Sequence, residues 1–537
     1  MCGIFSILGY IDHSQILKYF YSIKNRGPDT SSIFMKDDLF IGFHRLSIND
    51  LSVHGQQPFL YNDGEDIIAV VCNGEIYNHT DLKKEYELDY VSHSDCAVIY
   101  PLFKKLDYDF KELNKRLNGE YAMTIYRITP TKTYFYASTD PLSVRPLFYS
   151  MNSTSFATSS LMKGLLFTKS VHRLEQGMCL MGYYENGMVH FIDKTLYVES
   201  PPIIYKTETQ QLYEKIVYIF TECVKKRIHN MDTDFCCLLS GGLDSSLVSA
   251  VAQRLSNKPI KTFTIGSKGS PDVEYAQKVA DHIGSDHHVI EIDLDNSIQY
   301  IDDVIKTLET FDITTIRAST GQYLISKYIS ENTDIKVVLN GDGADEVQMG
   351  YLYFFSAPCE SCAHSEQKRL LSEIHLYDGL RVDRCISHHG LEARLPFLDF
   401  DFVRLFDEIS ASIKIPKYKG MEKYLIRKAF EEVYKNDPIL PASVLWRKKE
   451  AFSDGISKKE KSWYQILQDY FNEKISDEDF EKDKQNYTPV PLSKEAYYYR
   501  KMYEKYFGNH TQITEYWMPK WSKTNDPSAR TLKVYDQ

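Results

Sequence analysis

The chain has 537 residues and a net charge of −11, from 63 Lys and Arg against 74 Asp and Glu. This length exceeds what one hydrophobic core usually supports, so we expect two domains. The acidic balance and the lack of a Lys or Arg block argue against nucleic acid as the main partner. No apolar run approaches the roughly 20 residues of a membrane span, and the N-terminus lacks the basic start and apolar core of a signal peptide. We therefore expect a cytoplasmic protein that acts on small molecules, with no membrane partner.

The first part of the chain is rich in predicted strands. Between Gly3 and about Asp193, short alternating or apolar runs are separated by turns, at residues 4–8, 39–43, 67–72, 121–128, 134–137 and 178–184. Helical spacing occurs near residues 15–23 and 94–106. This mixture predicts an α+β sandwich.

The second part alternates strands with helices. Pro201 and Pro202 interrupt the regular pattern near a boundary at residues 197–205. After it, apolar runs predict strands at 235–239, 261–265, 288–292 and 335–339, with helices at 247–255, 273–283 and 298–308. This is the pattern of an α/β doubly wound parallel sheet, in which ligands collect beyond the carboxyl ends of the strands.

A turn of small residues, Ser-Gly-Gly-Leu-Asp-Ser-Ser at 240–246, follows the first of these strands. Its glycines let the backbone approach an anion, while serine hydroxyls and the amides of the next helix can donate to it. A serine-rich capping turn without a ligand is the alternative. The string resembles the ATP pyrophosphatase loop, and this resemblance implies a bound pyrophosphate, AMP as a product, and Mg²⁺ on Asp244.

Cys2 is a candidate nucleophile. Removal of Met1 would leave it with a free α-amine, whose pKa near 8 suits it to act as a base for the thiol. Five motifs support this reading: Arg-Gly-Pro-Asp at 26–29, His-Arg-Leu-Ser-Ile at 44–48, Gln-Pro at 57–58, Asn-Gly-Glu-Ile-Tyr-Asn at 73–78, and Ser-Asp at 94–95. Together they resemble the class II glutamine amidotransferase domain, an N-terminal-nucleophile (Ntn) hydrolase with αββα layers. The resemblance implies that Cys2 attacks the glutamine amide and releases ammonia.

Glutamine recognition in this domain needs groups for a carboxylate, an ammonium and an oxyanion. Arg45 can pair with the carboxylate, and Glu75 and Asp95 can hold the ammonium. The Asn73 amide and the Gly74 N–H can donate to the oxyanion. By the resemblance, the glutamine-binding residues are Arg45, Leu46, Ser47, Ile48, Asn49, Asn73, Gly74, Glu75 and Asp95.

A second acidic turn, Asn-Gly-Asp-Gly-Ala-Asp-Glu at 340–346, follows a later strand of the same predicted sheet. With the segments at 310–319, 350–354, 391–399 and 446–455, it resembles the glutamine-hydrolysing asparagine synthetase family from residue 2 to about residue 530. The resemblance implies a glutaminase domain at 2–195 and an ATP pyrophosphatase-like synthetase domain at 205–530. It also implies the substrates ATP, aspartate and glutamine, with Mg²⁺ accompanying ATP.

The same resemblance assigns roles to residues of the second domain. Lys449 would neutralise phosphate charge, and Asp342 would act in forming β-aspartyl-AMP. Aspartate would be bound by Thr314, Thr315, Arg317 and Glu346, and the metal by Asp244 and Asp345. ATP would be bound by Leu238, Ser240, Gly241, Gly242, Asp244, Ser245, Ile265, Asn340 and Gly341.

One position departs from the family pattern. Many members have Ser-Gly-Glu-Gly where this chain has Asn-Gly-Asp-Gly at 340–343, so Asp342 keeps the charge on a side chain one methylene shorter. We expect activity to be retained, because some relatives also carry Asp.

Three questions stay open at this stage. The acceptor could be another carboxylate, or the chain could be a catalytically silent glutamine or nucleotide sensor. The oligomeric state is also undetermined, with a homodimer as one arrangement. Cys359 and Cys362, near His364, have the spacing of half a zinc site, but the sequence offers no second pair of ligands nearby.

Overall fold

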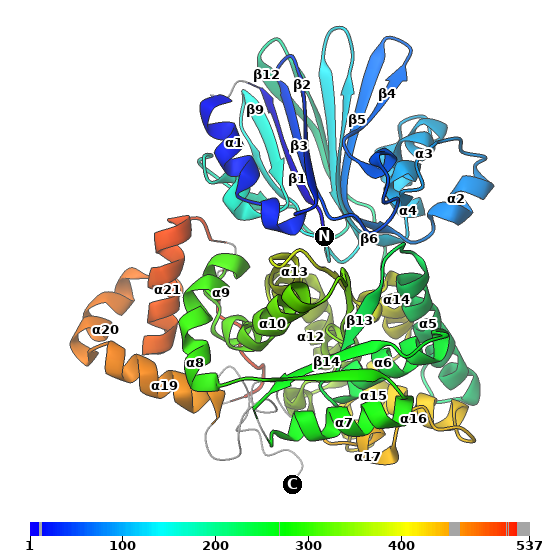
Figure 1. Cartoon of the computed structure of the whole chain (residues 1–537), viewed down its shortest axis with the longest axis vertical. Helices are drawn as coiled ribbons and strands as arrows, with labels where there is room; N and C mark the ends of the chain where they lie inside the picture. Colours follow the sequence, from blue (N-terminus) through cyan, green and yellow to red (C-terminus); the bar gives the residue numbers. More distant parts are fainter. Residues whose placement is uncertain (10–12, 268, 450–461, 512, 514, 523–537) are drawn as a thin grey trace. The chain divides into compact units, whose positions relative to one another are not determined.

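The computed structural model of the chain describes residues 1–9, 13–267, 269–449, 462–511, 513 and 515–522. It divides into two compact units (Figure 1). The first comprises residues 1–199, 230–234 and 387–392, and the second comprises residues 200–229, 235–386 and 393–537. Part of the motif at 446–455, from residue 450, lies outside the described residues.

The first unit contains two six-stranded sheets whose pairings are antiparallel. One sheet has the order β10 (His172–Arg173), β8 (Phe148–Met151), β9 (Ser155–Ser159), β1 (Gly3–Gly9), β3 (Leu39–Arg45), β2 (Thr30–Lys36). The other has the order β12 (Met188–Leu196), β11 (Met178–Glu185), β7 (Thr133–Thr139), β6 (Gly119–Ile128), β5 (Asp66–Ile76), β4 (Phe59–Asp63).

The core of this unit lies between the two sheets, with helices against their outer faces. Ile4 and Phe43 of one sheet are in a buried cluster with Val71 and Phe135 of the other. Helix α1 (His13–Tyr21) places Phe20 against strands β1 and β3. Helices α3 (Ile99–Lys105) and α4 (Phe110–Arg116) pack on the opposite side of the second sheet. The predicted αββα sandwich is confirmed.

The second unit contains a five-stranded sheet. Its order is β15 (Asp286–Glu291), β14 (Lys261–Gly266), β13 (Phe235–Leu238), β16 (Val337–Leu339), β17 (Glu392–Arg394). The first four strands are parallel to one another. The chain runs outward from β13 through β14 to β15 and then returns to the other side of β13 as β16. This reversal between β13 and β16 is the topological switch point at which such sheets bind ligands.

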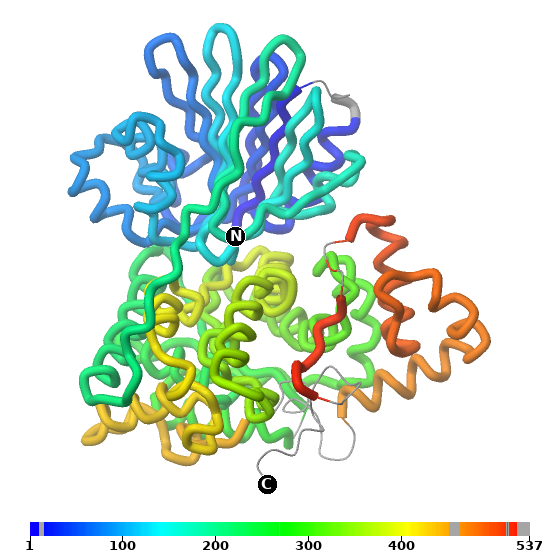
Figure 2. The backbone as a smooth tube through the Cα atoms, turned by 180° about the vertical axis from the view of Figure 1, so that it is seen from behind, coloured from blue at the N-terminus to red at the C-terminus, as the bar shows by residue number. Residues whose placement is uncertain are grey.

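Helices connect these strands. The predicted helices α6 (Leu243–Leu255) and α7 (Pro271–Ile283) contact β13 and β14 respectively. Helix α10 (Ile313–Asn332), which was not predicted from the sequence, also contacts β14. The expected helix at 298–308 is divided into a 3₁₀ turn and α9 (Ile301–Leu308). The C-terminal helices α19 (Trp463–Lys474), α20 (Asp477–Asp483) and α21 (Lys494–Phe507) form a separate arm, in which α21 lies beside α9 (Figure 2).

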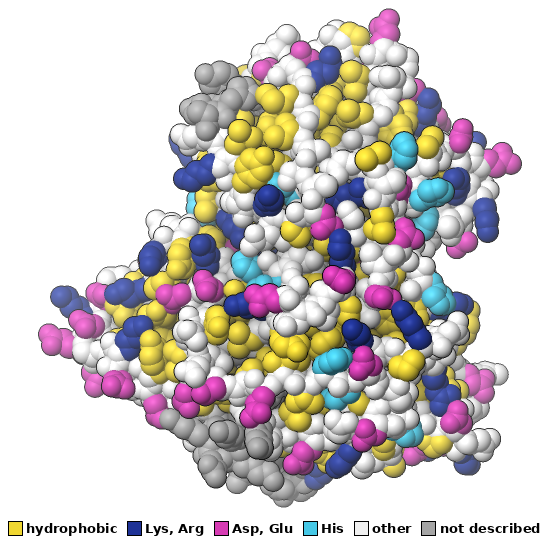
Figure 3. Space-filling model, viewed as in Figure 1, with side chains coloured by type: hydrophobic (Ala, Val, Ile, Leu, Met, Phe, Trp, Pro, Cys, Tyr) yellow, Lys and Arg dark blue, Asp and Glu magenta, His cyan; other side chains and the backbone are white. Residues whose placement is uncertain are grey.

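The surface carries charges of both signs. On the face shown in Figure 3, Lys and Arg side chains are interspersed with Asp and Glu side chains. Among the described helices, none is both long enough and apolar enough to cross a membrane.

Candidate active sites

Cys2 lies at the start of strand β1, next to the end of strand β3. Its Sγ is 3.4 Å from the backbone N of Leu46, and Arg26 Nε donates to its carbonyl oxygen at 3.0 Å. Burial raises the pKa of the Cys2 thiol to about 11. The structure retains Met1, whose buried amino group lies 3.1 Å from the Leu391 carbonyl oxygen and has its pKa lowered to about 5 by burial. In this unprocessed form the thiol therefore has no neighbouring α-amine of its own.

Asn73 and Gly74 lie near the end of strand β5. Both polar atoms of the Asn73 side-chain amide are buried and have no hydrogen-bond partner among the described residues. Such unpaired buried groups are costly, which makes them candidates for contacts with a bound ligand. Gly74 has a φ of 145°, and a Cβ there would collide with the backbone of Glu120 and Tyr121 in β6. The position therefore requires glycine.

The remaining glutamine-binding candidates gather around the loop after β3. Asn49 Nδ2 donates to Glu75 Oε2 at 2.6 Å and to Asp95 Oδ1 at 3.3 Å, so it connects the two predicted ammonium ligands. Arg45 donates to the backbone carbonyl of Ser52 at 2.8 Å, which holds the loop in place. Ser47 and Ile48 are fixed through their backbones, by Asp29 and Asp232 respectively.

The second site is a cavity of about 540 Å³ at the carboxyl ends of β13, β14 and β16. Every residue predicted to bind ATP, aspartate or metal lines it, except Gly241. With the predicted catalytic residues Asp342 and Lys449, the predicted residues that line the cavity are Leu238, Ser240, Gly242, Asp244, Ser245, Ile265, Thr314, Thr315, Arg317, Asn340, Gly341, Asp345 and Glu346.

The Ser-Gly-Gly turn folds tightly at the start of α6. Ser240 Oγ lies 3.0 Å from Ser245 Oγ, and the backbone N–H of Ser240 donates to Ser245 Oγ at 3.1 Å. Gly241 has a φ of 71°, and a Cβ there would meet the backbone of α7. A Cβ on Gly341 would lie 2.7 Å from Ser245 N. The two glycine-rich loops of the switch point are therefore in direct contact.

Two lysines surround the predicted metal ligands. The buried Lys423 Nζ lies 2.7 Å from Asp345 Oδ1 and also pairs with Asp244, while Lys449 Nζ pairs with Asp345 Oδ2. Although burial opposes ionisation of Asp345, these two ammonium groups lower the pKa of its carboxyl well below the usual range. The pKa of Lys423 is raised because the two carboxylates outweigh the cost of its burial.

Asp342 and Glu346 belong to a second group of charges in the cavity. Arg381 Nη2 lies 2.5 Å from Asp342 Oδ1 and 2.9 Å from Asp378 Oδ1. The Tyr351 hydroxyl lies 2.7 Å from both Glu346 Oε1 and Asp378 Oδ2. Burial, and then the negative charge of Asp378, raise the pKa of Glu346 well above its usual value. This environment therefore favours the protonated form of the Glu346 carboxyl.

The predicted aspartate ligands lie at the start of α10. Thr314 Oγ1 is buried without a partner among the described residues, whereas Thr315 Oγ1 donates to Asp312 at 2.7 Å. Arg317 forms a buried bidentate ion pair with Glu495, in which Nε donates to Oε1 at 2.8 Å and Nη2 donates to Oε2 at 2.6 Å. Its guanidinium is thus tied to helix α21, a contact that no local sequence pattern indicated.

Sequence reasoning missed Lys423, Asp378 and Arg381. Asp378 and Arg381 are three residues apart in helix α13 (Asp378–Ser387). An acidic and a basic residue at this spacing lie on the same face of a helix, so the sequence could have indicated an ion pair here. Lys423 precedes helix α16 (Tyr424–Val433), and no motif surrounds it.

The two units define a class of enzyme: a glutamine amidotransferase that joins an Ntn-type sandwich to a nucleotide-binding parallel sheet in one chain. Residues 1–201 match the glutamine amidotransferase domain family, and residues 215–370 and 356–530 match the asparagine synthase family. The glutamine-hydrolysing asparagine synthetases of Cricetulus griseus and Homo sapiens are each 38% identical over 568 aligned positions, which cover 100% of this chain and 99% of theirs. The chain therefore belongs to the family of glutamine-hydrolysing asparagine synthetases.

A solved structure is also similar in part. The glutamine phosphoribosylpyrophosphate amidotransferase of B. subtilis, complexed with ADP and GMP, is 17% identical, with a TM-score of 0.31 over 54% of this chain and 81% of that one.

Proposed function

We propose that the two sites perform the two half-reactions of a glutamine-dependent asparagine synthetase, a carbon–nitrogen ligase. ATP, aspartate, glutamine and water give AMP, pyrophosphate, asparagine and glutamate through β-aspartyl-AMP. The observation that carries this proposal is the presence of both residue sets in one chain whose full length aligns with that family.

In the glutaminase half-reaction, the Cys2 thiolate attacks the carbonyl carbon of the glutamine amide. The unpaired Asn73 amide and the Gly74 N–H donate to the oxyanion that forms. Ammonia leaves, and water then hydrolyses the thioester to release glutamate. Glu75 and Asp95, connected by Asn49, would bind the substrate ammonium. Arg45 would pair with the substrate carboxylate.

In the synthetase half-reaction, the aspartate β-carboxylate attacks the α-phosphorus of ATP. The Ser-Gly-Gly turn and the start of α6 supply hydroxyl and N–H donors for phosphate oxygens. Lys449 and Lys423 neutralise the charge that develops on the leaving pyrophosphate. Thr314 and Arg317 orient the aspartate, and ammonia then displaces AMP from its β-carbonyl.

The residues also fit Mg²⁺. Asp244 Oδ1 is buried and has no hydrogen-bond partner among the described residues, and carboxylate oxygens with substrate phosphates are the usual ligands of this ion. When bound by Asp244 and Asp345, Mg²⁺ would supply charge neutralisation at the phosphates. Lys423 pairs with both of these carboxylates.

The test is a product assay on the purified full-length protein with aspartate, Mg²⁺, ATP and either glutamine or ammonium. We expect asparagine, AMP and pyrophosphate from both nitrogen sources, and the loss of only the glutamine reaction in Cys2→Ala. AMP and pyrophosphate without asparagine would indicate a different acceptor. ATP binding without cleavage would favour a silent sensor.

Several finer assignments belong to the same proposal. The glutaminase domain at 2–195 and the synthetase domain at 205–530 are proposed as the functional boundaries. A cytoplasmic location and assembly as a homodimer stay predictions, for which cell fractionation and light scattering are the measurements.

A further inference from the structure

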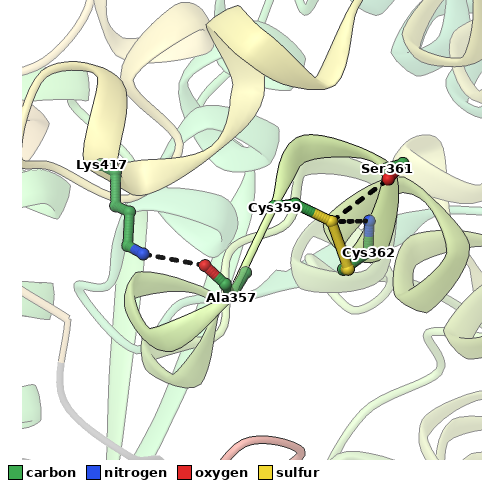
Figure 4. Close-up of a disulfide and its surroundings, with 5 residues drawn as sticks. All are labelled: Ala357, Cys359, Ser361, Cys362 and Lys417. Atoms are coloured by element: carbon green, nitrogen blue, oxygen red, sulfur yellow. Dashed lines mark hydrogen bonds between the residues drawn. A yellow bond between two sulfur atoms is a disulfide. The ribbon is translucent and has the colours of Figure 1, made fainter.

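Helix α12 (Glu360–Glu373) begins at a disulfide between Cys359 and Cys362 (Figure 4). The Cα atoms of this pair are 5.2 Å apart, within the usual range for bridged residues. Cys359 is exposed and Cys362 is half-buried, whereas seven of the eight free cysteines are buried. Within the described residues, no group of three His, Cys, Asp or Glu side chains is arranged to hold a metal. The half zinc site considered from the sequence is thus replaced by a bond between the two sulfurs.

We propose that Cys359 and Cys362 are a redox-active pair whose oxidation state sets the rate of the synthetase half-reaction. The pair exchanges with a dithiol, either a small molecule or a dithiol protein. Nothing in the proposed catalytic steps uses either cysteine.

The position of the pair favours thiol–disulfide exchange. Cys359 is the N-cap residue of α12, and the Cys362 N–H points at its Sγ over 3.2 Å. The partial positive charge of a helix N-terminus stabilises a thiolate there, which lowers the pKa of such a cysteine and makes it a better leaving group. Cys359 is also an exposed residue, so a reductant can approach the pair from solvent.

The next turns of α12 connect the pair to the synthetase cavity. Gln367 Nε2 donates to the Val347 carbonyl oxygen in helix α11 (Ala344–Gln348), which carries Asp345 and Glu346. Glu366 Oε1 accepts a hydrogen bond of 2.9 Å from the hydroxyl of Tyr353, which lines the cavity. Both α12 side chains are buried. These two contacts join α12 directly to the helix that carries Asp345 and Glu346 and to a side chain that lines the cavity.

The exchange balances in two steps. A thiolate of the dithiol attacks one protein sulfur, the Cys359–Cys362 bond breaks, and the released thiolate takes a proton from water. The second thiol of the reductant, after losing its proton, attacks the mixed disulfide and releases the other cysteine. The protein disulfide gains two electrons and two protons, and the dithiol becomes a disulfide.

The oxidised state is the active one in this proposal. The bond joins the N-cap to the third helical residue, the same span that a capping side chain covers in other helices. Reduction breaks this covalent link, so the first turn is no longer held closed by a bond between its ends. We expect the synthetase rate to fall about threefold to tenfold on reduction, where a factor of ten corresponds to about 1.4 kcal/mol.

The test couples a redox titration to an activity assay on the full-length protein. The protein is equilibrated with mixtures of reduced and oxidised dithiothreitol and assayed for AMP with ammonium as nitrogen source, so that Cys2 is not used. Differential alkylation and mass spectrometry report the state of Cys359 and Cys362. We expect the rate and the disulfide fraction to change at the same midpoint. A rate that stays constant while the pair is reduced, or a pair that never forms a disulfide, would overturn the proposal.

Variants separate regulation from a purely structural bond. Cys359→Ala and Cys362→Ala, neither of which adds a capping side chain, should each fix the rate at the reduced level and abolish its redox response. Ser361→Ala, which alters an exposed residue between the two cysteines, should keep the response. Thermal unfolding of each variant is measured in parallel. If reduction shifts the melting temperature without changing the rate, the disulfide only stabilises the fold, and the proposal is rejected.

Discussion

Lys423 Nζ lies 2.7 Å from Asp345 Oδ1, and the same ammonium pairs with Asp244. Asp244 follows β13 and Asp345 follows β16, so one buried cation joins the two loops of the topological switch point. Two carboxylates this close would repel each other without it. The pairing thus offsets the repulsion between the two carboxylates at the proposed phosphate site.

Lys423→Met should therefore lose ATP cleavage. The substitution keeps most of the side-chain length but removes the charge that faces both carboxylates and the phosphates. We expect AMP formation to fall on the order of 10²-fold or more, as for other lost electrostatic contacts to a transition state. Lys419→Met, at an exposed lysine in the same segment, is the matched control and should retain its rate. Glutamate release from glutamine should persist in both variants, and a wild-type AMP rate in Lys423→Met would contradict this role.

Asn73→Ala should impair only the glutaminase. The Asn73 amide has no partner among the described residues, so its removal breaks no hydrogen bond within the fold that the structure describes. We expect kcat for glutamine hydrolysis to fall on the order of 10²–10³-fold, the usual effect of losing one oxyanion donor. The internal control is asparagine formation from ammonium, which should be unchanged. An equal loss with both nitrogen sources would indicate misfolding instead.

Removal of Met1 should control the reactivity of Cys2. In the unprocessed chain, burial raises the thiol pKa to about 11, so the thiolate fraction at pH 8 is small and grows about tenfold per pH unit. Alkylation of Cys2 by iodoacetamide should rise with pH up to about pH 11 in this form. After processing, the free α-amine can accept the thiol proton, and alkylation and glutaminase activity should both appear near pH 8. Equal alkylation rates for the two forms at pH 8 would disprove the amine's role.

Local patterns predicted the parts of the molecule that depend on local chemistry. Strands β13 and β16 and the glycine-rich loops after them were evident because apolar runs end in residues that permit close backbone approach, as at Gly241 and Gly341. Strands β2, β4, β8, β9, β10 and β12 of the first unit were not predicted. Of these, β8 and β10 have four and two residues, which give too little alternation to detect. Lys423 and Glu495 were missed for another reason: their partners are distant in sequence, and only the tertiary fold brings them together.

The buried pair of Arg317 and Glu495 allows stability and aspartate binding to be separated. Removing one partner leaves an unpaired buried charge, so Arg317→Met alone should lower the free energy of unfolding by about 3–5 kcal/mol. The double variant Arg317→Met with Glu495→Leu should recover part of that stability, because no unpaired charge remains, although Gln468 and the Tyr499 hydroxyl lose the acceptor that Glu495 provides.

If Arg317 also orients aspartate, the double variant should still show an aspartate KM raised at least about tenfold, the effect of losing about 1.4 kcal/mol of binding energy. Urea unfolding and steady-state kinetics with ammonium measure the two effects separately. Lys225→Ala, which breaks an exposed ion pair with Glu222, is the control and should change stability by less than about 1 kcal/mol. If the double variant recovers its stability and also has the wild-type KM for aspartate, Arg317 serves only to connect helices α10 and α21 and does not bind aspartate.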